Sequence, residues 1–368
     1  MRIVYMLASL GIGGAEKQVL ALAGRMAERG HTVTLVTLLP QASEEWPTAL
    51  PVIHLNLHKN PLSLAAVLLR ARRILLRLKP DLVHSHSFHA NIFARLVSLI
   101  AGRPAVISTI HNVYEGGWHR MLAYRITDGL CAHTTAVSKA VADRFIHLKA
   151  VDANRCTVVQ NAIDLREFAS DSARRAITRM NLRADNEFVW LAAGRISPAK
   201  DYPNLLHAFA RVIENNPNAS LRIAGEGRDE ELRRLQAMIG ELRLSRQIEW
   251  LGLRRDLPAL LDACDGFVSS AAWEGMPLTI AEAMAMEKPI VATDVGGVRE
   301  LVAEAVSLVP PRNPDALAKA MIEMMRKPEP GRQAIGRASR LRIQSSFDIE
   351  SRITQWEALY RSIFSTAS

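Results

Sequence analysis

Residues 2–16 read RIVYMLASLGIGGAE, an apolar run that passes through a glycine-rich turn into a helical pattern. Glycines at such a turn allow backbone N–H groups to approach an anion at the positive end of the following helix. We interpret the run from Ile3 to Leu10 as a buried first strand and not as an export signal, because it is short and no small-x-small cleavage site follows it. The stretch therefore predicts a strand–loop–helix unit of an α/β protein.

The same alternation of short apolar strands and helix-period segments continues along the chain, which predicts parallel sheets with helices on both faces. The clearest predicted helices are Ala15–Arg29 and Leu62–Leu78. The predicted strands of the first half are Arg2–Leu7, His31–Leu38, Val52–Leu55, Leu82–His84, Ala105–Ile110, Ala132–Ala136 and Thr157–Val159. Those of the second half are Phe188–Ala193, Leu221–Ala224, Ile248–Leu251, Gly266–Ser269, Ile290–Thr293 and Ser307–Val309.

A polar, charge-rich stretch from Asp164 to Asn186 separates the two runs of alternation, and 368 residues suffice for two domains. We predict two doubly wound, Rossmann-like α/β domains over residues 1–165 and 166–347. The tail, Asp348–Phe364, is predicted to form an amphipathic helix with Asp348 as its N-cap, and residues from about 348 to 368 are assigned to the first domain. Because ligands of such sheets bind beyond the carboxyl ends of the strands, we expect the site in a cleft between the facing domains. The sequence has no stretch of about 20 apolar residues, so no segment is predicted to span a bilayer.

The formal charge of +9 is concentrated in the first half. Residues 1–165 contain 18 Lys and Arg against 10 Asp and Glu, a net +8, whereas the remainder contains 28 against 27, a net +1. A basic half suggests a negatively charged partner such as phosphates, anionic lipid or nucleic acid. The aromatic share of 5% argues against the stacking platforms of single-strand nucleic-acid binders. Cys131, Cys156 and Cys264 form no CxxC pair, which indicates a reducing cytosol and no zinc site.

The first glycine turn does not identify its ligand. A nicotinamide-binding domain would have the full G-x-G-x-x-G pattern and an acid near the end of the second strand. That strand ends in Thr37-Leu38-Leu39-Pro40, without a carboxylate. The sequence therefore disfavours a nicotinamide cofactor.

Two strand-end loops of the second half carry residue types that bind phosphate. Residues 194–200, GRISPAK, directly follow the predicted strand Phe188–Ala193. Arg195 and Lys200 either clamp a diphosphate, Arg with its planar fork and Lys as a point charge, or are two solvated surface charges. Residues 225–227, GEG, follow the strand Leu221–Ala224 and either shape a nucleotide pocket or only turn the chain.

Residues 273–284, WEGMPLTIAEAM, are the most informative stretch. Pro277 suits the first turn of a helix, where its missing N–H costs nothing. This places Glu274 in the loop before the helix and Glu282 about one turn inside it. Backbone amides at the helix start then point outward, where the helix dipole attracts phosphate. Residues 288–300, KPIVATDVGGVRE, repeat the strand–turn–helix pattern, for which packing alone is as good an explanation as ligand contact.

Taken together, these residues resemble the retaining GT-B glycosyltransferases of family 4, which include mannosyltransferases, sucrose synthases and lipopolysaccharide glycosyltransferases. The resemblance extends over nearly the whole chain. It rests on five motifs in order: GGAE (residues 13–16), TIHN (109–112), NAID (161–164), GRISPAK (194–200) and the two glutamates of EGMPLTIAE (274–282). It implies a GT-B fold in which an acceptor-binding first domain, rejoined by the C-terminal helix, faces a donor-binding second domain.

The resemblance also implies roles for individual residues. Arg195 and Lys200 hold the donor diphosphate and stabilise the leaving group, whereas Glu274 contacts hydroxyls of the donor sugar. Glu282 takes the ribose hydroxyls, and His111 approaches the sugar from the first domain. The remaining donor contacts that it implies are Gly13, Gly14, Glu226, Gly275, Met276, Pro277, Leu278 and Thr279. Glu16 matches the acid of the Gly-Gly-x-Glu motif and is expected on the acceptor side.

The sequence departs from the family pattern at Ala199, where glutamate is common, and at Ala162, where glycine is common. Neither change removes a functional group used above. No Asp-x-Asp follows a strand and the 11 histidines form no ligand-spaced cluster, so we expect neither a metal nor a cofactor. The resemblance implies retention of the anomeric configuration, with the acceptor proton passing to the departing phosphate. His111 is the alternative base, and it is equally explained as a positioning group.

The predicted helix Leu62–Leu78 contains several arginines and no acid. Its predicted apolar face consists of Leu64, Leu68, Ala71, Leu75 and Leu78, and its basic face includes Arg70, Arg72, Arg73 and Arg77. Such a face either rests on anionic lipid, at roughly 1 kcal/mol per basic residue near the surface, or is simply solvated. We expect peripheral association with the inner face of the cytoplasmic membrane and a lipid-linked or surface-glycan acceptor.

The sequence leaves three functional alternatives: a glycosyltransferase, a sugar-nucleotide epimerase and a non-enzymatic binding protein. We favour transfer of a hexosyl or N-acetylhexosaminyl group from a UDP-sugar, with a GDP-sugar as the second choice. A sugar-nucleotide epimerase of similar architecture would not be expected to carry Arg195, Lys200 and both glutamates together. A non-enzymatic basic protein that binds lipid or nucleic acid would explain the charge but none of the strand-end motifs, and we expect no nucleic-acid partner.

Overall fold

The computed structural model describes residues 1–58, 61–184, 186–302 and 306–365. The chain divides into two compact units. Unit 1 comprises Met1–Ala162 together with helix α14 (Ile349–Ser365), and unit 2 comprises Ile163–Asp348. Each unit has its own parallel sheet and its own hydrophobic core.

Unit 1 contains a seven-stranded sheet in the order β3-β2-β1-β4-β5-β6-β7, and every pairing in it is parallel. Its strands are β1 (Arg2–Leu7), β2 (Thr32–Thr37), β3 (Val52–His54), β4 (Leu82–His86), β5 (Ala105–Ile110), β6 (His133–Ala136) and β7 (Cys156–Val158). The central strand β1 is buried on both faces, with Tyr5 in one hydrophobic cluster and Met6 in the other. Burial on both faces explains why β1 is almost continuously apolar.

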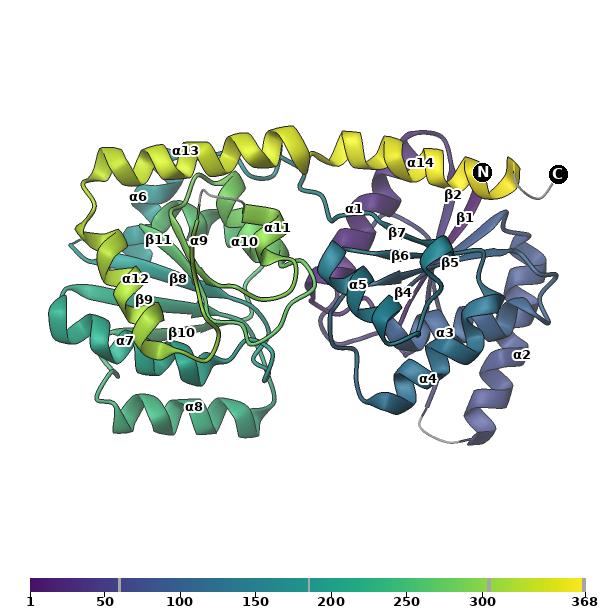
Figure 1. Ribbon diagram of the computed structural model, residues 1–368, viewed down its shortest axis with the longest axis horizontal. Helices are drawn as coiled ribbons and strands as arrows, with labels where there is room; N and C mark the ends of the chain where they lie inside the picture. Colours follow the sequence, from purple (N-terminus) through teal and green to yellow (C-terminus); the bar gives the residue numbers. More distant parts are fainter. Residues whose placement is uncertain (59–60, 185, 303–305, 366–368) are drawn as a thin grey trace. The chain divides into compact units, whose positions relative to one another are not determined.

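Helices cover both faces of this sheet (Figure 1). They are α1 (Gly14–Glu28), α2 (Pro61–Leu78), α3 (Ser87–Ser98), α4 (Trp118–Thr127), α5 (Lys139–His147) and α14, with short 3-10 turns at Asp128–Leu130 and Ala153–Arg155. Residues of α1 and α14 share a core with Tyr5, whereas residues of α2 and α3 share the opposite core with Met6. The sheet is therefore doubly wound, as the sequence predicts.

The C-terminal helix α14 is fastened to unit 1 by buried aromatic side chains. Trp356 and Tyr360 lie in the core that contains Tyr5. The hydroxyl of Tyr360 lies 3.1 Å from the hydroxyl of Tyr5 and 2.7 Å from Nδ1 of His84. The prediction that the last helix returns to the first domain is confirmed.

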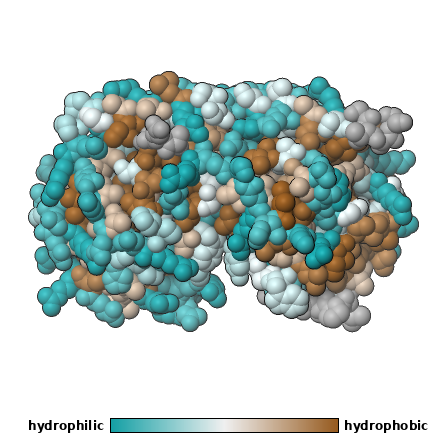
Figure 2. Space-filling view, in the orientation of Figure 1, coloured by the Kyte–Doolittle hydropathy of each residue, from teal (hydrophilic) through white to brown (hydrophobic). Residues whose placement is uncertain are grey.

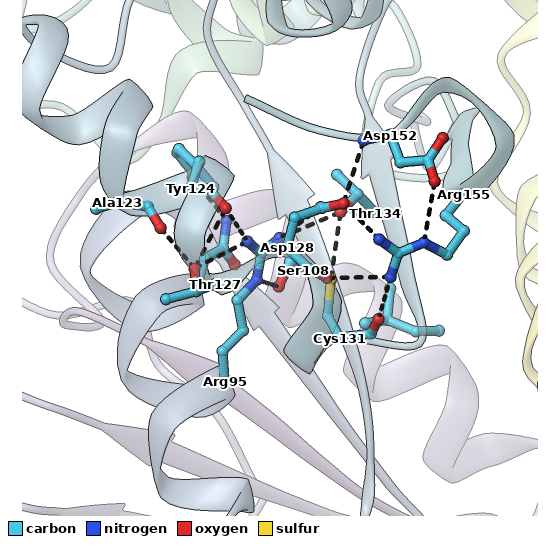
Figure 3. Close-up of polar contacts among 12 residues, drawn as sticks. Arg95, Ser108, Ala123, Tyr124, Thr127, Asp128, Cys131, Thr134, Asp152 and Arg155 are labelled. Carbon is cyan, nitrogen blue, oxygen red and sulfur yellow. Dashed lines mark hydrogen bonds and ion pairs between the residues drawn. The ribbon is translucent and has the colours of Figure 1, made fainter. Parts of the chain in front are cut away.

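A buried arginine ties the helices to the strands behind the α3–α4 layer (Figure 3). Arg95 of α3 is fully buried and donates to the hydroxyls of Ser108 on β5 and Thr134 on β6, at 3.0 and 3.1 Å. Its guanidinium lies 4.0 Å from the carboxylate of Asp128, which also accepts a 2.7 Å hydrogen bond from Arg155. Because a buried charge is tolerated only when it is paired and hydrogen-bonded, this network fixes α3 and α4 on the sheet.

Unit 2 contains a six-stranded parallel sheet in the order β10-β9-β8-β11-β12-β13. Its strands are β8 (Phe188–Ala193), β9 (Ala219–Ala224), β10 (Ile248–Gly252), β11 (Gly266–Ser269), β12 (Ile290–Thr293) and β13 (Ser307–Val309). Its helices are α6 (Ser172–Asn181), α7 (Tyr202–Asn215), α8 (Asp229–Glu241), α9 (Leu257–Ala263), α10 (Leu278–Ala285), α11 (Val298–Val302), α12 (Pro314–Arg326) and α13 (Glu329–Ser346).

Both sheets have the same topological switch point. The strand order reverses between β1 and β4 in unit 1 and between β8 and β11 in unit 2. In open parallel sheets, ligands bind outside the carboxyl ends of the strands at this point. The loops that follow β1, β4, β8 and β11 are therefore the first places to look for a site.

The thirteen predicted strands all occur, each within two residues of its predicted ends. The charge-rich stretch between the two runs of alternation is not irregular throughout, because it contains α6. This helix is polar because its arginines pair with acids near α9: Arg175 and Arg179 both donate to the carboxylate of Asp265, at 2.6 and 2.9 Å.

Two further sequence expectations bear on the described residues. Cys131, Cys156 and Cys264 are all free thiols. None of the described helices is both long and apolar enough to cross a membrane.

Candidate functional site

The loop after β8 is shaped by glycines that admit no side chain. A Cβ on Gly225, in the loop after β9, would lie 2.0 Å from the carbonyl oxygen of Gly194. A Cβ on Gly227 would lie 2.4 Å from Cβ of Ile196, whose N–H donates to the carbonyl oxygen of Glu226 at 2.6 Å. The GEG sequence therefore does more than turn the chain, because it packs the loop after β9 directly onto the GRISPAK loop.

Lys200 and Glu274 form an ion pair in which the ammonium group donates to Oε1 of the carboxylate. Lys200 lies in the loop after β8 and Glu274 in the loop after β11, so the pair bridges the switch point of the sheet. The Ser270 hydroxyl fastens the same two loops by donating to the carbonyl oxygens of Lys200 and Asp201, at 2.8 and 3.1 Å. A lysine has three N–H donors, so Lys200 can keep this contact and still bind a phosphate oxygen.

Arg195 lies on the same loop with its side chain exposed. Within the ranges that the structure describes, no residue forms a hydrogen bond or ion pair with its guanidinium group. Glu226, on the neighbouring loop, is also exposed. The switch point of unit 2 thus presents one cation held by a buried carboxylate and a second cation open to solvent, which suits a ligand that carries two phosphates.

Helix α10 begins one residue after Pro277, which occupies the N-cap position. Glu282 is only 3% exposed and lies one turn inside this helix. The loop before it is anchored to the next strand–helix connection, because the N–H of Gly297 donates to the carbonyl oxygen of Gly275 at 2.9 Å. Met276 and Leu278 are buried, whereas Thr279 is partly exposed. The EGMPLTIAE stretch thus forms a rigid loop and helix start beside the Lys200–Glu274 pair.

In unit 1, His111 directly follows β5, and His86 ends the neighbouring strand β4. Nδ1 of His86 lies 3.0 Å from Nε2 of His111. Burial lowers the pKa of His111 to about 4. At neutral pH this side chain is therefore an uncharged imidazole.

Glu115 is a residue of this region that the sequence analysis missed. Its Oε1 accepts a 3.3 Å hydrogen bond from the backbone N–H of His111, and its Oε2 accepts a 2.6 Å hydrogen bond from the hydroxyl of Tyr124. Burial raises the pKa of the carboxyl group to about 7. Glu115 holds the loop of residues 111–117, and no sequence pattern marks it, because a single acid in a loop is typical of a solvated position.

Gly13 is the N-cap residue of α1 and has an extended backbone. Its carbonyl oxygen accepts the first helical hydrogen bond from Lys17 at 3.0 Å and a 3.4 Å hydrogen bond from the indole of Trp46. Gly14 is exposed and Glu16 lies in the first turn of α1. The GGAE motif therefore begins a helix at the carboxyl end of β1, beside the switch point of unit 1.

The basic face of α2 is present, but one residue of its predicted apolar face is exposed. Arg70, Arg73 and Arg77 are exposed. Leu64, predicted to pack on the sheet, is 45% exposed, and the buried stripe begins one turn later at Val67. The helical spacing of the apolar residues is as predicted, but this spacing does not show at which residue α2 begins to pack on the sheet.

Among the described residues, no group of three or more His, Cys, Asp or Glu side chains is arranged to hold a metal ion.

Two family models match the chain, one on each half. The model described as Glycosyltransferase Family 4 matches residues 12–167, and the model described as Glycosyl transferases group 1 matches residues 173–342. Together they cover most of unit 1 and unit 2, including every strand-end loop described above except the start of the first one.

Similar proteins of known name are glycosyltransferases. The chain is 28% identical over 313 residues to the UDP-Gal:alpha-D-GlcNAc-diphosphoundecaprenol alpha-1,3-galactosyltransferase of Escherichia coli, covering 78% of this chain and 77% of that enzyme. It is 25% identical over 311 residues to the alpha-monoglucosyldiacylglycerol synthase of Acholeplasma laidlawii, covering 76% of each.

Solved structures share the fold. HepE of Anabaena, crystallised with UDP-glucose, superposes with a TM-score of 0.86 at 22% identity, covering 98% of this chain and all of HepE. WaaG, a glycosyltransferase involved in lipopolysaccharide biosynthesis, superposes with a TM-score of 0.78 at 17% identity, covering 97% of this chain and 99% of WaaG. The chain therefore belongs to the family 4 glycosyltransferases and is a glycosyltransferase with the GT-B fold.

Proposed function

We propose that the protein transfers a hexosyl or N-acetylhexosaminyl group from a UDP-sugar to a lipid-linked or surface-glycan acceptor, with retention of the anomeric configuration. The observation that carries the donor part is the pair of cations on the loop after β8 in unit 2, where Arg195 is exposed and Lys200 forms an ion pair with Glu274. The UDP moiety in the names of the Escherichia coli relative and of the HepE complex supports uridine over guanosine.

The reaction breaks the bond between the anomeric carbon and the diphosphate oxygen and forms a bond from that carbon to the acceptor hydroxyl oxygen. In the retaining mechanism, the acceptor attacks from the side of the leaving group and its proton passes to the departing phosphate. Negative charge then accumulates on the diphosphate, which Arg195, Lys200 and the N-terminus of α10 stabilise. Removing one such cation is expected to cost about 3 kcal/mol of transition-state stabilisation, a loss of about a hundredfold in kcat.

This charge arrangement also supports transfer without a divalent metal or other cofactor. Two side-chain cations and a helix N-terminus supply the charge that a metal ion supplies in other glycosyltransferases. The test is turnover of UDP-glucose, UDP-galactose, UDP-N-acetylglucosamine and GDP-mannose with a polyprenyl-diphosphate-linked sugar, in EDTA and in Mg²⁺, with the anomer of the product assigned by NMR. We expect one UDP-sugar to be consumed equally in both buffers with retention. Inversion, or activity only with Mg²⁺, would overturn the corresponding part of the proposal.

The outer surface of unit 1 supports an acceptor at a membrane. Helix α3 packs against both α2 and α4, and large hydrophobic side chains are exposed across this layer. Figure 2 shows hydrophobic side chains gathered over α2 and α3. On α4, Trp118, Leu122 and Ile126 recur every four residues on one face, with Trp118 77% and Ile126 72% exposed. The others are Leu64, Leu69, Leu76, Leu96, Leu99, Ile100 and Tyr114.

The charge of this layer matches an anionic bilayer. Residues 61–127 contain nine Lys and Arg against two acids, Asp81 and Glu115. Isolated exposed apolar residues are normal, but an apolar stripe within a basic surface is typical of a membrane-docking face. We therefore place the proposed site of action at the inner face of the cytoplasmic membrane, with α4 joining the basic face of α2 as a contact element.

Vesicle co-sedimentation tests this docking face. The wild type is expected to bind phosphatidylglycerol vesicles, with affinity falling at high salt, and to ignore phosphatidylcholine vesicles. Trp118→Ser with Ile126→Ser should reduce binding, whereas Ile177→Ser with Leu341→Ser, which changes exposed apolar residues of unit 2, should not. Failure of the wild type to bind either kind of vesicle would contradict membrane docking and leave glycosyl transfer to a soluble acceptor.

A further inference from the structure

Three histidines lie together on the carboxyl side of β4 and β5 in unit 1. His84 and His86 are two residues apart on β4, so their side chains project from the same face of the sheet. His111 follows the adjacent strand β5, and its Nε2 lies 3.0 Å from Nδ1 of His86. The candidate site residue His111 is thus one member of a histidine cluster, and the other two have no role in the proposed reaction.

His84 is fixed at both ring nitrogens. Its Nδ1 lies 2.7 Å from the hydroxyl of Tyr360 on α14, and its Nε2 lies 2.7 Å from the hydroxyl of Thr109 on β5. The His86 ring packs on the His84 ring with centroids 4.1 Å apart. The orientation of His86 is therefore set by a platform that α14 and β5 hold in place.

His86 itself is only half satisfied. It is 3% exposed, and its Nε2 is buried without a hydrogen-bond partner among the residues that the structure describes. A neutral imidazole carries one N–H donor and one acceptor nitrogen, so the His86–His111 hydrogen bond has two possible directions. Either His86 Nδ1–H donates to His111 Nε2, or His111 Nε2–H donates to His86 Nδ1.

The two directions differ in what they leave buried at Nε2 of His86. The first leaves a bare acceptor nitrogen, and the second leaves an N–H donor with no acceptor. Buried N–H donors without a partner are rarer in proteins than under-used acceptors. A charged His86 is disfavoured as well, since among the described residues no carboxylate is hydrogen-bonded to a ring nitrogen of these three histidines, and burial lowers the pKa of His86 well below the usual value. The first direction is therefore favoured.

We infer that His86 is a positioning residue that keeps the proton of His111 on Nδ1, so that His111 donates a hydrogen bond to a substrate oxygen and does not act as a base. The statement that His111 donates to the substrate and is not a base rests on the proposed glycosyl transfer, in which His111 contacts the substrate. With Nε2 of His111 accepting from His86, the nitrogen left for the substrate is Nδ1, and it already carries a proton. The acceptor proton must then leave by the other route, to the departing phosphate.

The protonation of the ring nitrogens can be measured without substrate. In full-length protein labelled with ¹⁵N-histidine, long-range ¹H–¹⁵N correlations at pH 7 distinguish protonated from bare ring nitrogens. His86→Leu and His111→Asn spectra assign the two residues. We expect both His86 and His111 to carry the proton on Nδ1. A proton on Nε2 of His111 would overturn the inference, whatever the enzyme transfers.

Activity gives the second readout. His111→Asn retains an amide N–H near the position of Nδ1 but cannot accept a proton as a base, whereas His111→Ala does neither. We expect His111→Asn to be at least tenfold more active than His111→Ala, with both variants still stabilised by UDP. Equal loss of activity in the two variants would overturn the donor role.

Substitutions of His86 separate positioning from folding. His86→Leu removes the hydrogen bond and is expected to lower kcat about tenfold, equivalent to a hydrogen bond of about 1.4 kcal/mol, with KM for the donor little changed. His86→Asn, whose amide can still donate to His111, should recover most of the rate. The control is His133→Leu, which removes a 2.8 Å hydrogen bond to Thr157 on the same sheet and should leave kcat unchanged. Equal rates for His86→Leu and wild type would contradict a positioning role.

Discussion

Replacing Glu115 by glutamine perturbs the loop that carries His111 without changing its size. In the wild type, the carboxyl group accepts hydrogen bonds from the backbone N–H of His111 and from the hydroxyl of Tyr124. Burial raises its pKa from the ordinary 4.5 to about 7. The folded protein therefore holds a proton on Glu115 over a pH range in which the unfolded chain has lost it.

The sign of the pH effect follows from this difference. Between pH 4.5 and 7 the folded state binds more protons than the unfolded state, so the free energy of unfolding falls as the pH rises, and the loss is complete above pH 7. The full shift corresponds to about 3 kcal/mol. About 2 kcal/mol of it is expected between pH 5 and 8, because part of the window lies below pH 5 and the side chain is only partly buried.

Urea unfolding of wild type and Glu115→Gln at pH 5 and at pH 8 measures this quantity. The variant lacks the titrating group, so relative to wild type it should gain about 2 kcal/mol of stability between the two pH values. Glu226→Gln, which changes an exposed carboxyl group of unit 2, serves as the control and should follow the wild type. A parallel pH dependence of Glu115→Gln and wild type would refute the assignment to this loop of a carboxyl group whose pKa is raised to about 7.

The other two stability predictions concern packing and a buried charge. Gly225→Ala is expected to destabilise unit 2 by roughly 1–3 kcal/mol, because its Cβ would lie 2.0 Å from a backbone oxygen. Gly240→Ala in α8 has no atom within 4 Å of the added Cβ and should stabilise unit 2 by up to about 1 kcal/mol. Equal melting temperatures for the two variants would contradict the packing argument. Arg95→Met is expected to cost about 3 kcal/mol, because Asp128 and several hydroxyls lose a buried partner. Arg2→Met, which breaks an exposed ion pair with Asp81, should cost less than about 1 kcal/mol in the same urea titration; an equally small loss for Arg95→Met would show that its network adds little.

The strands and the switch-point loops were predictable because local sequence determines them. Each strand is a short apolar run next to a glycine, proline or polar turn. A parallel strand whose two faces are both covered by helices is apolar on both sides, so such a run is enough to predict it. The GRISPAK and EGMPLTIAE stretches could be placed at strand ends for the same reason. Their meeting in the Lys200–Glu274 pair was not predictable, since it depends on β8 and β11 becoming neighbours across residues that are far apart in the sequence.

What the sequence analysis missed depends on burial and on long-range pairing. Glu115 is an ordinary loop acid until Tyr124 and the backbone of His111 lie beside it. His86 has a weak signal, because His84 and His86 alternate on one face of a predicted strand, but its partner follows a different strand. Exposure of Leu64 depends on where the neighbouring layer ends, which helical periodicity does not encode. The arrangement of the two domains around one site stays a prediction.

The most direct test of the central claim is thermal unfolding with excess UDP in EDTA, for wild type, Arg195→Ala and Arg246→Ala. A ligand at 100 times its dissociation constant stabilises the folded state by about 2.7 kcal/mol. The account predicts this stabilisation for the wild type and for Arg246→Ala, an exposed arginine before β10, and its loss in Arg195→Ala. Equal stabilisation of all three proteins, or none of the wild type, would contradict a metal-free diphosphate site at the switch point of unit 2.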